Sequence, residues 1–124
     1  MSILALPAFS DDTAACMVFS ETISAMLLTH DMWRQFTSKR IVDAHADAQV
    51  LLCLSADSRD EVSSMVDKAS GAGGRADPTP VQGFGFMYGR SFEEPDGRIW
   101  EGLRLILSTR ACARPLNPSH VAMY

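Results

Sequence analysis

Residues 83–103, read as GFGFMYGRSFEEPDGRIWEGL, constrain the fold of this chain more than any other segment. Aromatic residues recur at every second position in the first half, as they do on one face of a strand. Pro95, Asp96 and Gly97 then provide a turn, because proline presets φ and glycine accepts φ values that other residues avoid. A second strand-like run follows this turn. The segment therefore predicts a β-hairpin.

The second strand of this hairpin carries one carboxylate, Glu101. Counting by twos places Ile99 and Leu103 on the face of Glu101, and Trp100 and Arg104 on the other face. An unpaired buried charge is costly, so we expect Glu101 either to lie at a wet rim or to have a partner. In a concave sheet that partner would be a metal ion or a substrate.

Composition and charge limit the classes of protein. The chain has 124 residues, of which 47% are hydrophobic, and this predicts one globular domain with a real core. A net charge of −4 argues against a nucleic-acid partner. No apolar run approaches the roughly 18 residues that cross a membrane, so we expect a soluble protein without a membrane partner. Three cysteines without metal-type spacing or a signal peptide favour a cytoplasmic location.

The N-terminal half predicts a pair of strands. Residues 13–19 and 22–29 have strand composition and are joined by a short turn at residues 20–21. Residues 2–9 contain a proline, which restricts them to a poor or edge strand. Residues 37–48 are polar and predict a loop or a short helical turn.

The middle of the chain predicts a strand followed by a helix. Residues 49–56 form an almost continuous apolar run, QVLLCLSA, typical of a central strand buried on both faces. Ser58 and Glu61 then form a capping box, which begins a helix. An apolar stripe at helical spacing follows over residues 62–69, and the glycines of residues 71–74 end the helix.

From residue 49 onward the expected order is strand, helix, weak edge segment at residues 75–82, strand, strand. This βαβββ order, together with the sequence FMYGRSFEEPDGRIWE, resembles the vicinal oxygen chelate superfamily. That superfamily includes glyoxalase I, bleomycin-resistance proteins, fosfomycin-resistance enzymes and extradiol dioxygenases. The strongest resemblance is to small bacterial glyoxalase-like, or lactoylglutathione-lyase-like, proteins, and it covers about residues 9–103.

The resemblance implies an α+β fold in which βαβββ modules build a cupped mixed β-sheet, with a ligand cavity inside the cup. The second module corresponds to residues 49–107 and is complete. The first is incomplete, because only residues 1–8 precede the strands that match its later part. The resemblance therefore implies one glyoxalase-like domain over residues 1–107 and an atypical C-terminal tail at residues 108–124. An incomplete cup leaves open sheet edges, which predicts a homodimer.

The resemblance also implies positions for a metal site. Metal-dependent members take ligands from the opening and closing strands of each module, and Glu101 matches the closing carboxylate of the second. Two other ligand positions fall near Leu51 and Met26, which do not bind a hard divalent ion. Glu101 is thus the candidate catalytic and metal-binding residue, and the ligand set is incomplete. Leu51 and Met26 become candidates for lining a ligand cavity.

Three further residues are candidates for ligand binding. His30 follows the second strand and would face the mouth of the cup, although a lone histidine there is more often a surface residue. Phe86 and Tyr88 belong to an aromatic stripe that is read as one strand face. This stripe is more often packing than a stacking platform. Its members are Phe84, Phe86, Tyr88, Arg90 and Phe92.

Three functions remain open. The missing ligands favour a metal-free binding protein that holds a small apolar or aromatic molecule, similar to the drug-sequestering members of the superfamily. The second is a lyase of the glyoxalase type that polarises vicinal oxygens through a divalent metal. The third is a degenerate dimeric protein without a ligand.

Overall fold

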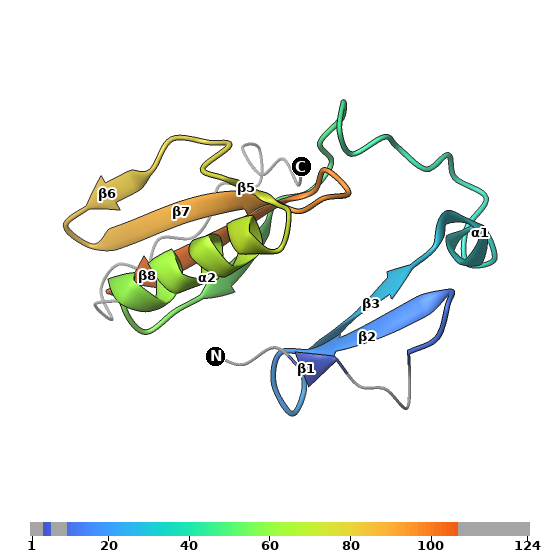
Figure 1. The fold of residues 1–124 in the computed structure, drawn as a ribbon, viewed down its shortest axis with the longest axis horizontal. Coiled ribbons are helices and arrows are strands. Elements are labelled where there is room, and N and C mark those ends of the chain that lie inside the picture. Colours follow the sequence, from blue (N-terminus) through green and yellow to red (C-terminus); the bar gives the residue numbers. More distant parts are fainter. Residues whose placement is uncertain (1–3, 6–9, 107–124) are drawn as a thin grey trace, which may run out of the picture. The chain divides into compact units, whose positions relative to one another are not determined.

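A computed structural model describes residues 4–5 and 10–106, with side chains from residue 10 onward (Figure 1). The predicted tail at residues 108–124 lies outside the described residues. The chain divides into two compact units, Met1–Val42 and Asp43–Tyr124, and each is described by itself. The single domain expected over residues 1–107 stays a prediction.

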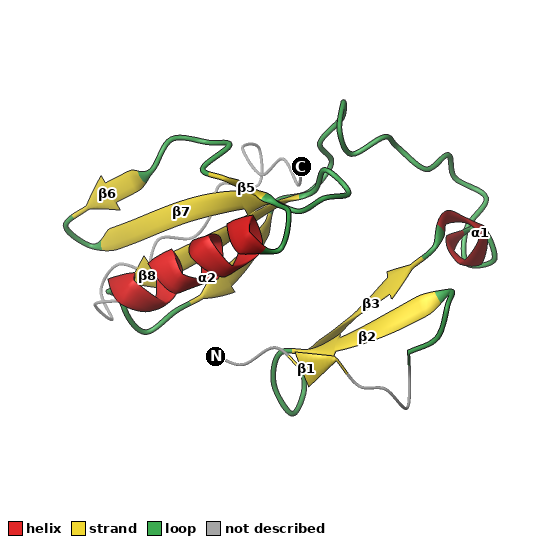
Figure 2. Ribbon diagram, in the orientation of Figure 1, coloured by secondary structure: helices red, strands yellow, loops and turns green. Residues whose placement is uncertain are grey.

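The first unit contains a three-stranded antiparallel sheet in the order β1-β2-β3 (Figure 2). The pairing of β2 with β3 confirms the two strands predicted at residues 13–19 and 22–29. A short helix, α1, follows β3 and is capped by Thr29, whose Oγ1 accepts a hydrogen bond from the Met32 amide at 3.4 Å. The elements are β1 (Leu4–Ala5), β2 (Ala14–Val18), β3 (Ser24–Leu28) and α1 (His30–Trp33).

The second unit contains a mixed sheet with one helix against it. Strand order is β4-β8-β7-β5, with β6 also paired to β7; β4 runs parallel to β8 and the other pairs are antiparallel. This arrangement confirms the α+β class and the strand–helix–strand order expected for residues 49–107. The elements are β4 (Leu52–Ser55), α2 (Arg59–Gly71), β5 (Arg75–Ala76), β6 (Gln82–Phe84), β7 (Met87–Glu93) and β8 (Ile99–Leu105).

Helix α2 begins and ends where its sequence predicts. The Ser58 Oγ accepts a hydrogen bond from the Glu61 amide at 3.1 Å, and the Glu61 carboxylate accepts one from the Asp57 amide at 2.7 Å. The first contact satisfies an amide that the first turn of a helix leaves unpaired, and the second holds the residue before the N-cap. Beyond the C-terminus, Gly73 has a φ of +96°, which glycine adopts without strain.

The same helix covers one face of the sheet. Val62 and Val66 are fully buried, and they lie one turn apart on the helix. A Cβ placed on Gly102 of β8 would lie 3.3 Å from both Val62 Cγ1 and Met65 Sδ, so the missing side chain lets α2 approach the strand closely. On this face the rings of Phe92 and Trp100 stack at 6.4 Å.

The hairpin predicted at residues 83–103 is confirmed in β7 and β8. The Gly97 amide donates to the Glu94 carbonyl at 2.8 Å, and Gly97 has a φ of +92°. The Glu94 carboxylate accepts hydrogen bonds from Arg98 Nη1 and Trp100 Nε1, both at 3.1 Å. A Cβ on Gly97 would lie 2.7 Å from the His45 amide nitrogen, so this turn packs closely on the loop before β4.

The connection between β5 and β6 is held to β7 by polar contacts. Asp77 has a φ of +48°, which is unusual for a residue with a side chain. Its carboxylate accepts hydrogen bonds from Nε and Nη2 of Arg90 at 3.1 and 2.7 Å. Two residues later, Thr79 Oγ1 lies 2.6 Å from the hydroxyl of the buried Ser91.

Two predictions about the second unit are wrong. Residues 49–56 do not form a central strand buried on both faces, because among the described strands β4 pairs only with β8 and exposes alternate residues. The aromatic stripe is also not one face of one strand. A turn at Gly85 and Phe86 separates β6 from β7, and Phe84 pairs with Met87, which places it opposite the face of Tyr88.

Candidate functional site

Glu101 lies on the face of the sheet that α2 does not cover. Its Cα partners are Cys53 on β4 and Ser91 on β7, so all three belong to the same face. Glu101 is half-buried. Within the described part of the chain, no lysine, arginine or histidine lies within 4.0 Å of its carboxylate. The predicted alternation along β8 is therefore confirmed, with a carboxylate on the face away from α2.

Cys53 is the neighbour that the sequence did not single out. Partial burial raises the pKa of its thiol above the ordinary value of 9.0, and the negative charge of Glu101 raises it further. At neutral pH the thiol is therefore protonated, and a protonated thiol is a weak nucleophile and a weak metal ligand. The charge of Glu101 therefore acts on this thiol in the direction opposite to the positive charges that activate a reactive cysteine.

The residues of this face do not fit a resident divalent metal. Among residues 10–106, no group of three or more histidine, cysteine, aspartate or glutamate side chains is arranged to hold a metal ion. Leu51 immediately precedes β4 and is half-exposed, with no donor atom to offer. Catalytic metal sites in proteins use about three protein ligands, which Glu101 and Cys53 do not supply. We therefore derive no chemical step through a metal.

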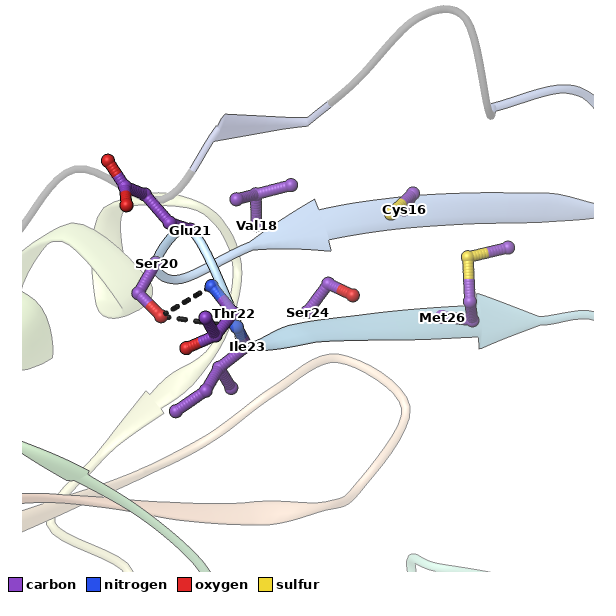
Figure 3. Close-up of a pocket in the computed structure, with 8 residues that line it drawn as sticks. All are labelled: Cys16, Val18, Ser20, Glu21, Thr22, Ile23, Ser24 and Met26. Carbon is purple, nitrogen blue, oxygen red and sulfur yellow. Dashed lines mark hydrogen bonds between the residues drawn. The ribbon is translucent and has the colours of Figure 1, made fainter.

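The first unit contains an open hollow of about 470 Å³ (Figure 3). Pairing of Cys16 with Met26 and of Val18 with Ser24 places these four side chains on one face of the β2–β3 ribbon. The turn between the strands closes one end of the hollow. Its lining residues are Cys16, Val18, Ser20, Glu21, Thr22, Ile23, Ser24 and Met26.

The lining of this hollow is mainly apolar. Cys16 is buried, whereas Met26 is 49% exposed and Ile23 is 62% exposed. The hydroxyl of Ser20 accepts hydrogen bonds from the amides of Thr22 and Ile23 at 3.4 and 3.1 Å, which holds the turn in place (Figure 3). A fixed turn beside exposed apolar side chains gives a small molecule a preformed surface to cover.

The structure distributes the predicted site residues between the two units. Met26 lines the hollow of the first unit, and His30 is the first residue of α1, where it is exposed. Glu101 and Leu51 belong to the second unit. Strand pairing gives two of these residues a cysteine neighbour: Cys16 is opposite Met26, and Cys53 is opposite Glu101.

The two aromatic candidates differ in their position relative to the face of Glu101. Tyr88 pairs with Arg104 and therefore lies on the face covered by α2, where the Arg59 guanidinium sits 4.9 Å from the centre of its ring. Phe86 lies in the turn between β6 and β7 and stacks on Phe84 at 5.9 Å. Tyr88 is therefore not on the face that carries Glu101, whereas Phe86 stacks on a ring that shares this face, because Phe84 pairs with Met87.

Solved structures with a similar backbone identify the fold of this chain. No family model matches the chain, and no curated protein matches it. A hypothetical protein from S. aureus is similar in structure, with a TM-score of 0.64 and 19% identity over 83% of this chain and 74% of that one. A glyoxalase/bleomycin resistance protein/dioxygenase family enzyme from Burkholderia phytofirmans PsJN has a TM-score of 0.61 and 13% identity over 84% of this chain and 80% of that one.

The fold is therefore of the vicinal oxygen chelate type, as the resemblance of residues 49–107 implied. Identities of 19% and 13% show the fold alone. One fold of this kind supports many chemistries, so function has to be argued from the side chains of this chain. In the part of the chain that the structure describes, no helix is long and apolar enough to cross a membrane.

Proposed function

We propose that this chain binds a small, mainly apolar or aromatic molecule in the hollow on β2 and β3, without a metal ion. The observation that carries this proposal is the exposure of Met26 beside Val18 and Cys16 in a hollow of about 470 Å³. That volume is within the range of small-molecule sites, which are lined mainly by apolar side chains with few polar groups. The fold shared with a bleomycin resistance/glyoxalase family enzyme is consistent with this role.

Covering the exposed apolar atoms supplies the binding free energy. Burial of apolar surface contributes roughly 25 cal/mol per Å², so a ring that covers the Met26 thioether and the neighbouring methyl groups gains a few kcal/mol. Methionine suits this role, because its flexible, polarisable side chain adapts to flat aromatic groups.

The test is a binding measurement with a matched pair of variants. Met26→Ala removes a side chain that lines the hollow, whereas Leu27→Ala removes the next residue of β3, whose side chain points to the opposite face. Calorimetric titration with small naphthalene derivatives should show binding to the wild type. Met26→Ala should weaken it about five-fold, equivalent to about 1 kcal/mol, and Leu27→Ala should leave it unchanged. Equal effects of the two variants would contradict the proposed site.

The metal-free part of the proposal has its own test. The thermal stability of the purified chain should stay flat across added zinc, nickel, iron and manganese, because a metal that binds only the folded state would raise it. Stoichiometric metal in the purified protein that disappears in Glu101→Ala would overturn this part and favour the metal-dependent lyase. A chain that responds to neither metals nor apolar probes would instead favour the degenerate protein without a ligand.

A further inference from the structure

The hollow on β2 and β3 has one charged lining residue, Glu21. The other lining residues are apolar or carry hydroxyl groups. Glu21 lies in the turn between the strands, and its side chain extends to the same side of the ribbon as Val18 (Figure 3). A carboxylate is therefore set at one end of an apolar surface.

The polar groups nearest to Glu21 do not neutralise it. The Ser20 hydroxyl oxygen already accepts the amides of Thr22 and Ile23, so its hydrogen-bonding is directed into the turn. Among the residues that the structure describes, no lysine, arginine or histidine lies within 4.0 Å of the Glu21 carboxylate. The four basic residues of the described first unit lie beyond β3, at positions 30, 34, 39 and 40.

We infer that the ligand of this hollow is a hydrophobic cation, an aromatic or apolar body that carries an ammonium or amidinium group. The inference rests on the proposed function and adds the charge of the ligand to it. The apolar body covers Val18 and Met26, and the cationic group lies beside the Glu21 carboxylate. A carboxylate accepts charge-assisted hydrogen bonds from such a group and repels an anionic ligand of the same shape.

The charge preference should be modest, because Glu21 is exposed. Exposed ion pairs contribute about 0.2–1 kcal/mol, which corresponds to a preference of roughly 1.4- to five-fold. Salt screens such a pair, so the preference should shrink at about 0.5 M ionic strength while the apolar contribution stays.

Three probes of one shape separate the charge of the ligand from its apolar body: 1-naphthylmethylamine, 1-naphthylmethanol and 1-naphthoate. The wild type should bind the amine about three-fold more tightly than the alcohol at low salt, and the naphthoate most weakly. Glu21→Gln should bind amine and alcohol equally, with the affinity for the alcohol unchanged. Asp12→Asn, which removes an exposed carboxylate of the same unit outside the lining set, is the matched control and should keep the preference.

The location of binding is read from the ε-methyl group of Met26 in protein labelled with ¹³C-methyl methionine. Its NMR signal should move on addition of the amine in the wild type and in Glu21→Gln, which also shows that the variant is folded. If the wild type binds the amine and the alcohol equally, or Glu21→Gln keeps the preference, the inference about charge is overturned while binding in the hollow stands. If none of the three probes binds, the proposed function itself fails.

Discussion

Asp77 and Arg90 form a bidentate ion pair. Two nitrogens of one guanidinium meet two oxygens of one carboxylate, and this geometry makes the pair stronger than a single contact. The contact also raises the pKa of Arg90, through its hydrogen bonds to Asp77 first of all. It fixes a residue with a φ of +48° at the start of the link between β5 and β6.

We expect the loss of this pair to destabilise the second unit. Arg90→Ala should lower the free energy of unfolding by about 1–3 kcal/mol, because it leaves a half-buried carboxylate without its donors. Arg75→Ala is the control. It breaks the contact of Arg75 with Glu93, in which the arginine side chain is 68% exposed against 18% for Arg90, and should cost less than about 1 kcal/mol. Urea unfolding followed by circular dichroism measures both, and equal losses would contradict the argument.

The charge of Glu101 should slow the alkylation of the neighbouring Cys53 thiol. Removal of the Glu101 charge should lower the pKa of the Cys53 thiol, so Glu101→Gln should be alkylated faster at Cys53 at about pH 8 than the wild type. Peptide-resolved mass spectrometry after iodoacetamide treatment measures this rate. The buried Cys16 in the same sample is an internal control, and its rate should not change.

The same shift has a consequence for stability. The folded state raises the pKa of the Cys53 thiol, so its contribution to stability is fully present below the pKa of the unfolded chain. That contribution is lost as the pH rises through the raised value. Stability measured from about pH 8 upward should therefore fall less steeply in Glu101→Gln than in the wild type. A steeper fall in the variant would show that Glu101 does not act on this thiol.

Local signals explain why several elements are predictable from sequence. The capping residues of α2, its glycine stop and the turn at Pro95, Asp96 and Gly97 each act within a few residues, and the structure confirms all three. Strand pairing is not local. The apolar run at residues 49–56 does not show whether one or two neighbours cover it, and β4 has only β8 among the described strands.

Because strand pairing is not local, the hollow and the Cys53–Glu101 pair could not be predicted from the sequence either. Each depends on the register of two strands, Cys16 with Met26 in one case and Cys53 with Glu101 in the other. A shift of one residue would move every side chain of a strand to its other face. The family resemblance predicts Met26 at a cavity, and the alternation of residues along a strand predicts the face of Glu101. The residues opposite them follow only from the pairing of the strands.

Gly74, just beyond the end of α2, lies close to backbone carbonyl oxygens. A Cβ on Gly74 would lie 2.6 Å from the Glu93 carbonyl oxygen and 2.9 Å from that of Ala69, so Gly74→Ala must displace backbone. We expect a loss of about 1–3 kcal/mol, as for other overpacked sites. Gly71→Ala is the matched control, because nothing lies within 4 Å of its added methyl group. It should be neutral or stabilise the helix by up to about 1 kcal/mol. Thermal unfolding measures the change in stability of both variants, and equal changes would contradict the argument.

Strand β4 lies at the edge of its sheet among the described strands, where a second copy of the chain could pair with it. Its outer edge has no partner among the described strands, and residues 49–55, QVLLCLS, contain no charge and no proline to protect it. Val50 and Leu51, just before it, are each 50% exposed. Edges of this kind pair with other strands unless charge or proline blocks them.

We therefore expect the chain to form a homodimer in which β4 strands of two copies pair. Light scattering coupled to size-exclusion chromatography should give the mass of a dimer for the wild type. Leu51→Lys should shift the equilibrium toward the monomer by placing like charges at the edge of both copies. Val81→Lys, an equally exposed apolar position away from β4, is the control and should stay dimeric. A monomeric wild type would contradict this expectation.

The stacked indole of Trp100 has a spectroscopic consequence. The chain has two tryptophans, and the division into units places one in each. Trp33 is 46% exposed, whereas Trp100 is 7% exposed, lies against the Phe92 ring and donates to Glu94. Indole emission moves to longer wavelength in water, so the two fluorophores emit at different wavelengths in the folded chain. Trp33→Phe and Trp100→Phe would each leave one native fluorophore, and unfolding of the two units could be followed separately.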